Sequence, residues 1–251
     1  MTPEQAVIAT HGAVHDVPAV FMLHGSTYGR GAELGYEGID FYTCGRGAPL
    51  GDVDADVVAA SFVFFSPTYI RGAWERGASV ESRAQAAVSF MECGYGWARR
   101  KLDTENGGVM ASTDLARLAE LLTVIVDTAS PACAPLFGAH RAMTRPGVHD
   151  AAALVLHLLD SLRELRGGLH GAAVVANGLT PLEALSIHTP HMVPIFGWTE
   201  PAPVADPSLE GRWHAAETAT NMSMARAFAV LDAAALNELV ELCARLPTAS
   251  T

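Results

Sequence analysis

The residues best suited to chemistry lie in the stretch LRELRGGLHGAAVVANGLTPLEA, residues 162–184. Its apolar spacing predicts a helix through Arg163 and Arg166 that ends at Gly167-Gly168, after which His170 opens a second helix. Histidine transfers protons near neutral pH, and a neighbouring guanidinium can bind a carboxylate or phosphate through paired hydrogen bonds. We therefore predict His170 as a catalytic acid/base group and Arg166 as a substrate-binding group. The alternative is that both arginines complement the dipole at a helix end.

Two further segments place polar side chains beside glycines, which let a ligand approach the backbone closely. FYTCGRGAPLG (41–51) contains Tyr42 and Arg46, and PLFGAHRAM (135–143) contains His140. We predict Tyr42 and Arg46 as substrate-binding residues and His140 as a second catalytic residue. A structural turn and a hydrogen-bonded core histidine are the alternatives.

A cluster of phenylalanines occurs in SFVFFSP, residues 61–67. Such residues commonly form the core, and they also line pockets that bind aromatic ligands. We predict that Phe64 and Phe65 contact the substrate.

Histidine pairs raise the possibility of a metal site. His11 and His15 are one helical turn apart, and His24 follows nine residues later. His188 and His191 are the first and last residues of the motif HTPH. Helical His-x3-His spacing can bind zinc, but no third ligand can be assigned from the sequence, so we predict no metal and assign His24 to catalysis instead. Neither nucleotide-binding glycine motif and no GxSxG nucleophile motif occurs, so we predict no cofactor and no covalent catalysis.

Composition limits the partners. The 251 residues include 27 acidic and 16 basic side chains, a net charge of −11, and Lys101 is the only lysine. Phosphate neutralisation supplies most of the affinity of DNA-binding proteins. The net negative charge therefore argues against a nucleic-acid partner, and we expect a small-molecule substrate or ligand. No apolar run approaches the roughly 20 residues of a membrane helix. The start MTPEQAVIATHG lacks the features of a signal peptide, and the four cysteines form no CxxC pair, so we expect a cytoplasmic protein without membrane contact.

Periodic apolar residues predict a mainly α fold with few short strands. Two segments are candidate strands, 17–23 and 191–198, and a break near 103–111 divides a single compact unit (1–251) into an N-terminal half (1–102) and a C-terminal half (112–251). A weak internal repeat, with glycine turns at Gly35 and Gly178, suggests two related halves around a central cleft. A homodimer is left open. Helices are predicted within 55–65, 82–102, 112–129, 150–167 and 231–246.

Three blocks together resemble a known family. FYTCGRGAPLGDVDADVVAASFVFFSPTYI, PLFGAHRAM and LRELRGGLHGAAVVANGLTPLEA, in that order, are similar to the SalK-like actinobacterial family, often labelled helix-turn-helix or MarR-like. The resemblance implies two winged-helix-related halves, and some members lie among natural-product biosynthesis genes. Where members carry a recognition helix and wing, this chain has SIHTPHMVPIFGWTEPAPVADPSLEGRW (186–213), whose prolines oppose a continuous helix.

Together these features lead us to expect a cofactor-independent acid/base enzyme of natural-product metabolism. It would catalyse a condensation, cyclisation or isomerisation of a small aromatic or carboxylated metabolite. The alternatives are a MarR-like winged-helix transcriptional regulator and a non-catalytic small-molecule-binding protein. A regulator should show an exposed basic stripe, whereas an enzyme should show convergent polar groups in an enclosed pocket.

Overall fold

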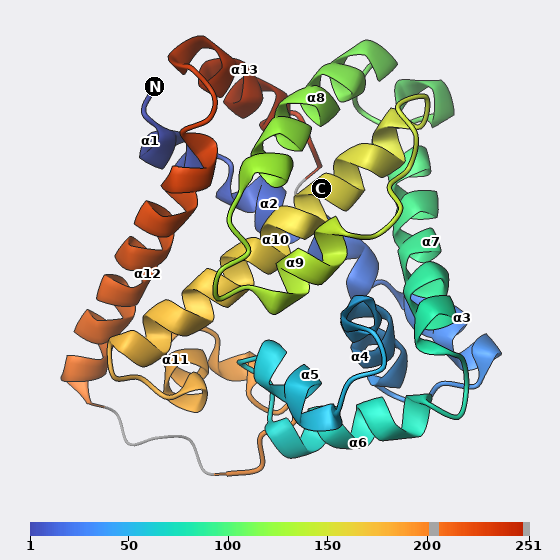
Figure 1. Ribbon diagram of the computed structural model, residues 1–251, viewed down its shortest axis with the longest axis vertical. Coiled ribbons are helices and arrows are strands. Elements are labelled where there is room, and N and C mark those ends of the chain that lie inside the picture. Colours follow the sequence, from blue (N-terminus) through green and yellow to red (C-terminus); the bar gives the residue numbers. More distant parts are fainter. Residues whose placement is uncertain (201–205, 248–251) are drawn as a thin grey trace.

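The fold is mainly α-helical, as the sequence predicts (Figure 1). The computed structural model describes residues 1–200 and 206–247. Within these residues no strand forms, and the only β-type pairing is an isolated bridge between Asp103 and Met110. The first part of the chain forms α1 (Pro3–Ala9), α2 (His11–Met22), α3 (Gly25–Leu34), α4 (Asp40–Gly47), α5 (Ala55–Ser61), α6 (Pro67–Gly77) and α7 (Arg83–Lys101). The second part forms α8 (Ser112–Thr128), α9 (Pro135–Arg141), α10 (Ala151–Ala176), α11 (Pro181–His188), α12 (Pro207–Phe228) and α13 (Ala233–Cys243). Short 3₁₀ helices occupy Ala48–Leu50, Thr104–Asn106 and Pro190–Met192.

Both predicted strands are wrong. Residues 17–23 lie in α2 and its C-cap, because Val17 and Phe21 are one turn apart and pack into the core on a helical face. Residues 191–198 form the end of a 3₁₀ helix and consecutive turns. No β-hairpin wing is therefore present in the described part of the chain.

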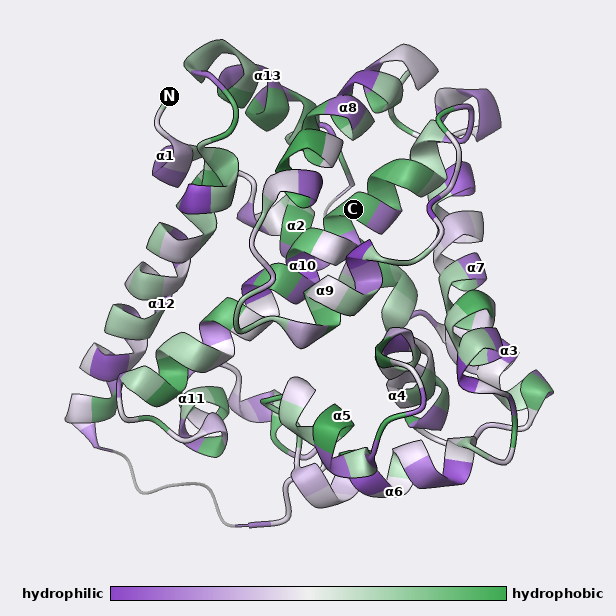
Figure 2. Cartoon of the chain, in the orientation of Figure 1, coloured by the Kyte–Doolittle hydropathy of each residue, from purple (hydrophilic) through white to green (hydrophobic). Residues whose placement is uncertain are grey.

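The 26-residue helix α10 is the centre of the fold and crosses the middle of the molecule in Figure 1. It packs against α2, α7, α8, α9 and α12. Its first four turns are buried almost all round, since apolar residues occupy nearly every face, as expected of a helix in the core. Hydrophobic positions alternate there with a few hydrophilic ones (Figure 2), and these polar residues bear on the site described below.

The predicted helix break at Gly167-Gly168 is wrong, because α10 continues through both glycines to Ala176. A Cβ on Gly168 would lie 2.6 Å from the Cα of Ala134, and one on Gly171 would lie 2.8 Å from the side chain of Val63. These two glycines therefore serve close packing of neighbouring segments rather than a helix end. The helix ends instead at Ala176, with Asn177 as its C-cap before Gly178, whose φ is 73°.

One hydrophobic core contains residues from both sides of the 103–111 segment, including Phe21, Phe90, Phe137 and Phe228. A smaller cluster around Val174 and Trp213 joins the C-terminal end of α10 to α11 and α12. Among the described residues, no single helix is long and apolar enough to cross a membrane. Only Pro3–Met22 and Gly25–Leu34 taken together, bent by 43°, reach the required length and composition.

Candidate small-molecule binding site

A cavity of about 650 Å³ lies beside the middle of α10. Helices α2, α4, α10, α11 and α12 form its walls, together with the turn after α5 and the segment after α11. Its lining includes His11, His15, Asp16, Met22, Leu23, Tyr28, Ile39, Tyr42, Arg46, Phe62, Phe64, Phe65, Arg163, Arg166, Gly167, His170, Leu185, His188, His191, Met192, Ile195, Phe196, Trp213 and Glu217.

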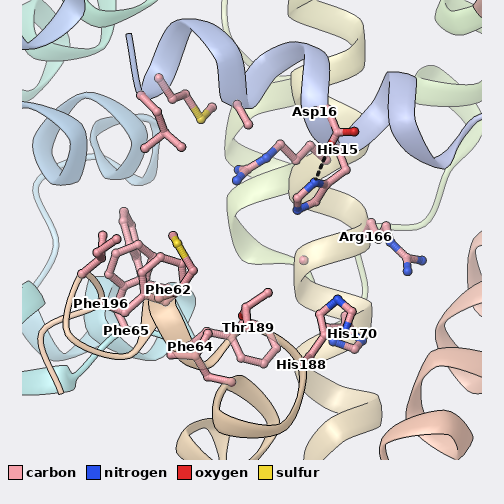
Figure 3. A pocket seen from close by; sticks show the side chains of 18 of the residues that line it. His15, Asp16, Phe62, Phe64, Phe65, Arg166, His170, His188, Thr189 and Phe196 are labelled. Carbon is pink, nitrogen blue, oxygen red and sulfur yellow. Dashed lines mark hydrogen bonds and ion pairs between the residues drawn. The ribbon is translucent and has the colours of Figure 1, made fainter. Parts of the chain in front are cut away.

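The cavity has an aromatic side and a polar side (Figure 3). Four phenylalanines gather on one side, and Phe65 stacks on Phe196 with ring centroids 4.0 Å apart. His15, Arg166 and His170 lie on the other side, with Phe64 reaching towards His170. A pocket divided in this way suits a molecule with an apolar body and a polar group.

The aromatic side is built by two segments that hold each other. Trp198 Nε1 donates a hydrogen bond to the carbonyl of Phe64 at 2.7 Å, and the Ser66 amide donates to the carbonyl of Phe196 at 2.9 Å. Val63 takes a left-handed conformation, φ 44°, which bends the chain between Phe62 and Phe64.

The proline-rich segment therefore forms a wall of the cavity in its described part. Pro190 opens a 3₁₀ helix and Pro207 is the first residue of α12. Pro201 and Pro203 lie outside the described residues. No α-helix occurs between 189 and 200, where the sequence resemblance implied a recognition helix.

His170 is held in one orientation by α12. The Thr220 hydroxyl donates to the carbonyl of Ala216 at 2.7 Å, so its oxygen accepts a hydrogen bond from His170 Nδ1 at 3.0 Å. Glu217 Oε1 is a further acceptor, 3.3 Å from the same nitrogen. These partners assign the proton to Nδ1 and leave Nε2 as an acceptor without a hydrogen-bond partner among the described residues.

The imidazole of His170 is neutral near pH 7. Burial lowers its pKa to about 4, an effect that the Glu217 carboxylate opposes and the Arg166 guanidinium reinforces. The ring lies 5.3 Å from Phe64 and 5.0 Å from Trp213, measured between centroids. His170 thus presents a lone pair at the border between the two sides of the cavity.

Arg166 and Arg46 both line the cavity, and both are already paired. Arg166 donates to Glu217 at 2.8 Å and to Asn221 at 2.9 Å, which joins α10 to α12. Arg46 donates to both carboxylate oxygens of Glu164, at 2.6 and 2.8 Å, and to the hydroxyl of Tyr42 at 3.0 Å. Although burial opposes charge, Glu164 raises the pKa of Arg46, and Arg46 lowers the pKa of Glu164.

Arg163 differs from these two arginines. Its side chain is 19% exposed, and the only carboxylate within 4.0 Å among the described residues is that of Glu164, at 3.6 Å. Glu164 is already engaged by Arg46, and the buried Nε of Arg163 has no hydrogen-bond partner in the described part of the chain. Arg163 is therefore a cation of the cavity lining whose guanidinium donors form no hydrogen bond with the described residues.

His11 and His15 lie on one face of α2, as their spacing predicts, with ring centroids 5.7 Å apart. Burial lowers the pKa of both, assisted by Arg166 for His11 and by Arg163 for His15. His15 Nδ1 lies 2.8 Å from Asp16 Oδ1, so this pairing occupies one ring nitrogen. Within the described ranges, no three His, Cys, Asp or Glu side chains are grouped as metal ligands, and the prediction about metals stays a prediction.

Two predicted catalytic histidines lie outside the cavity lining. His24 caps α3, because its Nδ1 accepts a hydrogen bond from the Ser26 amide at 3.1 Å. His140 is buried in the core with its Nε2 3.2 Å from Asp160 Oδ2. Burial is the largest single effect and acts to lower the pKa of His140, but the Asp160 and Glu164 carboxylates together outweigh it, so the pKa is raised. His170, the third histidine predicted as catalytic, lines the cavity, whereas His24 and His140 do not.

The residues on α12 are the main part of the site that sequence reasoning missed. Glu217, Thr220 and Asn221 share one helical face, at i, i+3 and i+4 spacing, and orient His170 and Arg166. Polar residues at that spacing beside Trp213 and Ala216, which are buried, would have been the signal.

These observations define a mainly α-helical protein with a ligand-sized cavity beside its central helix. A model of the Helix-turn-helix family matches residues 8–205, and the chain belongs to this family. The match supports the helix-turn-helix part of the resemblance, whereas the SalK-like assignment stays a prediction. No curated protein and no solved structure matches the chain significantly.

Proposed function

We propose that this protein binds a small, largely aromatic organic molecule in the cavity beside α10. The size of the cavity is the main support for this proposal. Its volume of about 650 Å³ lies within the range of about 300–1,000 Å³ that is typical of small-molecule sites. Aromatic side chains form most of one side, and a few fixed polar groups lie on the other, as in sites that orient a ligand.

Most arginines outside the cavity are paired with carboxylates, which favours ligand binding over DNA binding as the function. In α6, Arg71 pairs with Asp56 at 2.6 Å and Arg76 pairs with Asp40 at 2.7 Å. The same holds for most arginines outside the cavity, which lie within 4.0 Å of a carboxylate: Arg30, Arg71, Arg76, Arg99, Arg117, Arg145 and Arg245. Membership of a helix-turn-helix family is compatible with a regulator, but neutralised arginines contribute little to phosphate binding.

Blocking the cavity from within tests this proposal. Gly167 lines the cavity on α10, and a Cβ there would meet nothing within 4 Å. Gly167→Phe should therefore fill the cavity, whereas Gly211→Phe, on an exposed and equally open position of α12, is the matched control.

The readout is the fluorescence of N-phenyl-1-naphthylamine, a neutral aromatic probe that brightens in apolar sites. We expect the wild type and Gly211→Phe to bind it alike, and Gly167→Phe to bind it at least tenfold more weakly at an unchanged melting temperature. Absence of binding by the wild type, or equal binding by Gly167→Phe, would contradict the proposal.

A second candidate function is acid/base catalysis, which the fixed Nδ1–H tautomer of His170 favours. Nε2 could accept a proton from a bound molecule or from water, and Glu217, 3.3 Å from Nδ1, would stabilise the resulting imidazolium. Condensation, cyclisation or isomerisation of a natural-product intermediate would use such a base.

Hydrolysis of 2-naphthyl acetate, which needs only water as co-reactant, tests for this base. His170→Gln should lower the enzyme-dependent rate by roughly 10²–10⁴-fold if His170 is the base. A large fall in melting temperature with a normal rate in the folded fraction would instead show a structural histidine. His214→Gln, at an exposed position of α12, is the control.

A further inference from the structure

We infer that the ligand of this cavity is an aromatic carboxylate whose charged group binds Arg163. The inference rests on the proposed binding function and adds the charge of the ligand and the residue that recognises it.

Most charged side chains that line the cavity already have a hydrogen-bonded partner. Of the two acids, Glu217 pairs with Arg166, and Asp16 is hydrogen-bonded to His15 with 40% of its side chain exposed. Arg46 is matched by Glu164. Arg163 is the lining cation whose nearest carboxylate, 3.6 Å away, already serves another arginine.

Arg163 is costly to leave without a partner of its own. Its side chain is about four-fifths buried and donates no hydrogen bond to a described residue. Nε is fully enclosed, so a ligand can reach only the two terminal nitrogens, which are not shielded in this way. Donors in so buried a side chain are costly unless an acceptor reaches them. A carboxylate in the cavity supplies two acceptor oxygens in the plane that a guanidinium recognises.

The uncharged histidines beside Arg163 limit the charge of the anion that fits. The neighbouring rings of His11 and His15 have pKa values lowered by burial first and by the arginines second, so they carry no charge near pH 7. Arg163 is a single guanidinium without a carboxylate of its own, and the 40% exposed Asp16 is not among the carboxylates within 4.0 Å of it. It therefore matches a single negative charge, as on a carboxylate, better than a phosphate dianion. The aromatic side of the cavity takes the body of the molecule.

The spacing of Arg163 and His170 limits the length of the ligand. Arg163 and His170 are seven residues apart on α10, which corresponds to about 10 Å along the helix axis. A bicyclic aromatic acid spans most of that distance, so its carboxylate can reach Arg163 while its far edge lies beside Phe64 and His170.

The experiment compares a matched pair of competitors that differ in charge. N-phenyl-1-naphthylamine, bound in the cavity, is displaced by 2-naphthoate or by its neutral analogue 2-naphthamide. The variants are Arg163→Gln, Arg163→Lys, which keeps the charge but not the planar fork, and Arg226→Gln on an exposed position of α12 as the control.

We expect the wild type to prefer 2-naphthoate over 2-naphthamide by about tenfold or more, as one charged hydrogen-bonded pair provides. Arg163→Gln should lose this preference and keep its affinity for the neutral probe and the amide. Arg163→Lys should show an intermediate preference, and Arg226→Gln should behave as the wild type.

The failure of each proposal gives a different result. Equal displacement by the acid and the amide in the wild type overturns the inference, even if Arg163→Gln does not fold, and leaves the binding function standing. A preference for the acid that survives in Arg163→Gln overturns the assignment to Arg163. Failure of the wild type to bind the neutral probe removes the binding function and the inference together.

Discussion

The ion pair between Arg46 and Glu164 offers the sharpest test of how α4 and α10 are held together beside the cavity. The two side chains come from residues 118 apart in the chain, on α4 and α10, and form two hydrogen bonds of 2.6 and 2.8 Å. The side chain of Glu164 is 1% exposed and that of Arg46 is 10% exposed, so water screens the pair poorly. Glu164→Gln removes the charge and keeps the shape.

The expected loss follows from the interaction of the two charges. At about 4 Å between charge centres and an effective dielectric constant of about 20, the attraction is about 4 kcal/mol. This agrees with the roughly 3–5 kcal/mol lost when one partner of a buried pair is removed. Replacing both partners, in Arg46→Met/Glu164→Leu, should cost much less than the sum of the single changes, because no buried charge is left alone.

Urea unfolding followed by circular dichroism measures these free energies. We expect Glu164→Gln to shift the midpoint with an unchanged slope, which indicates a loss of stability in the folded state. A loss below about 1 kcal/mol, or single changes that add up in the double variant, would refute the assignment of this pair as a coupled buried interaction.

Three other predictions concern separate parts of the molecule. Gly168→Ala should destabilise the protein by about 1–3 kcal/mol in thermal unfolding, because the new Cβ would lie 2.6 Å from the backbone of Ala134. Gly167→Ala should be neutral or stabilising, because a Cβ there meets open space, and equal effects of the two changes would contradict this account. Burial, reinforced by His140, lowers the pKa of His157 in the folded protein to about 3. As the pH falls below 6.5, the unfolded chain therefore binds more protons than the folded protein, and stability is lost on acidification. This residue should account for about 2 kcal/mol of the loss between pH 7 and pH 5, and His157→Gln should show a correspondingly shallower pH dependence in urea unfolding; an unchanged dependence would refute the assignment. In gel-shift assays at about 150 mM salt the protein should show no specific binding to the DNA upstream of its own gene, because its net charge is −11 and most of its outer arginines are paired. A shift at nanomolar protein that resists competitor DNA would overturn this prediction.

Several features of this protein could be predicted from the sequence because they depend on neighbouring residues. The apolar periodicity of 82–102, 112–129 and 231–246 correctly predicted α7, α8 and α13, since the buried face of a helix repeats every three or four residues. The turns at Gly35 and Gly178 were also predicted correctly, and both glycines have positive φ angles that other residues adopt rarely.

Only the tertiary structure decided what the polar residues do. Gly168 resembled a helix end because glycine commonly ends helices, and its packing against Ala134 could not be foreseen from local sequence. His140 lies in the core because Asp160, on another helix, offers its carboxylate there. The orientation of His170 depends on Thr220, fifty residues further along the chain. Pairings of this kind are set by how the helices pack, so composition and spacing identify the residue types, while the long-range packing determines which of them meet in the cavity.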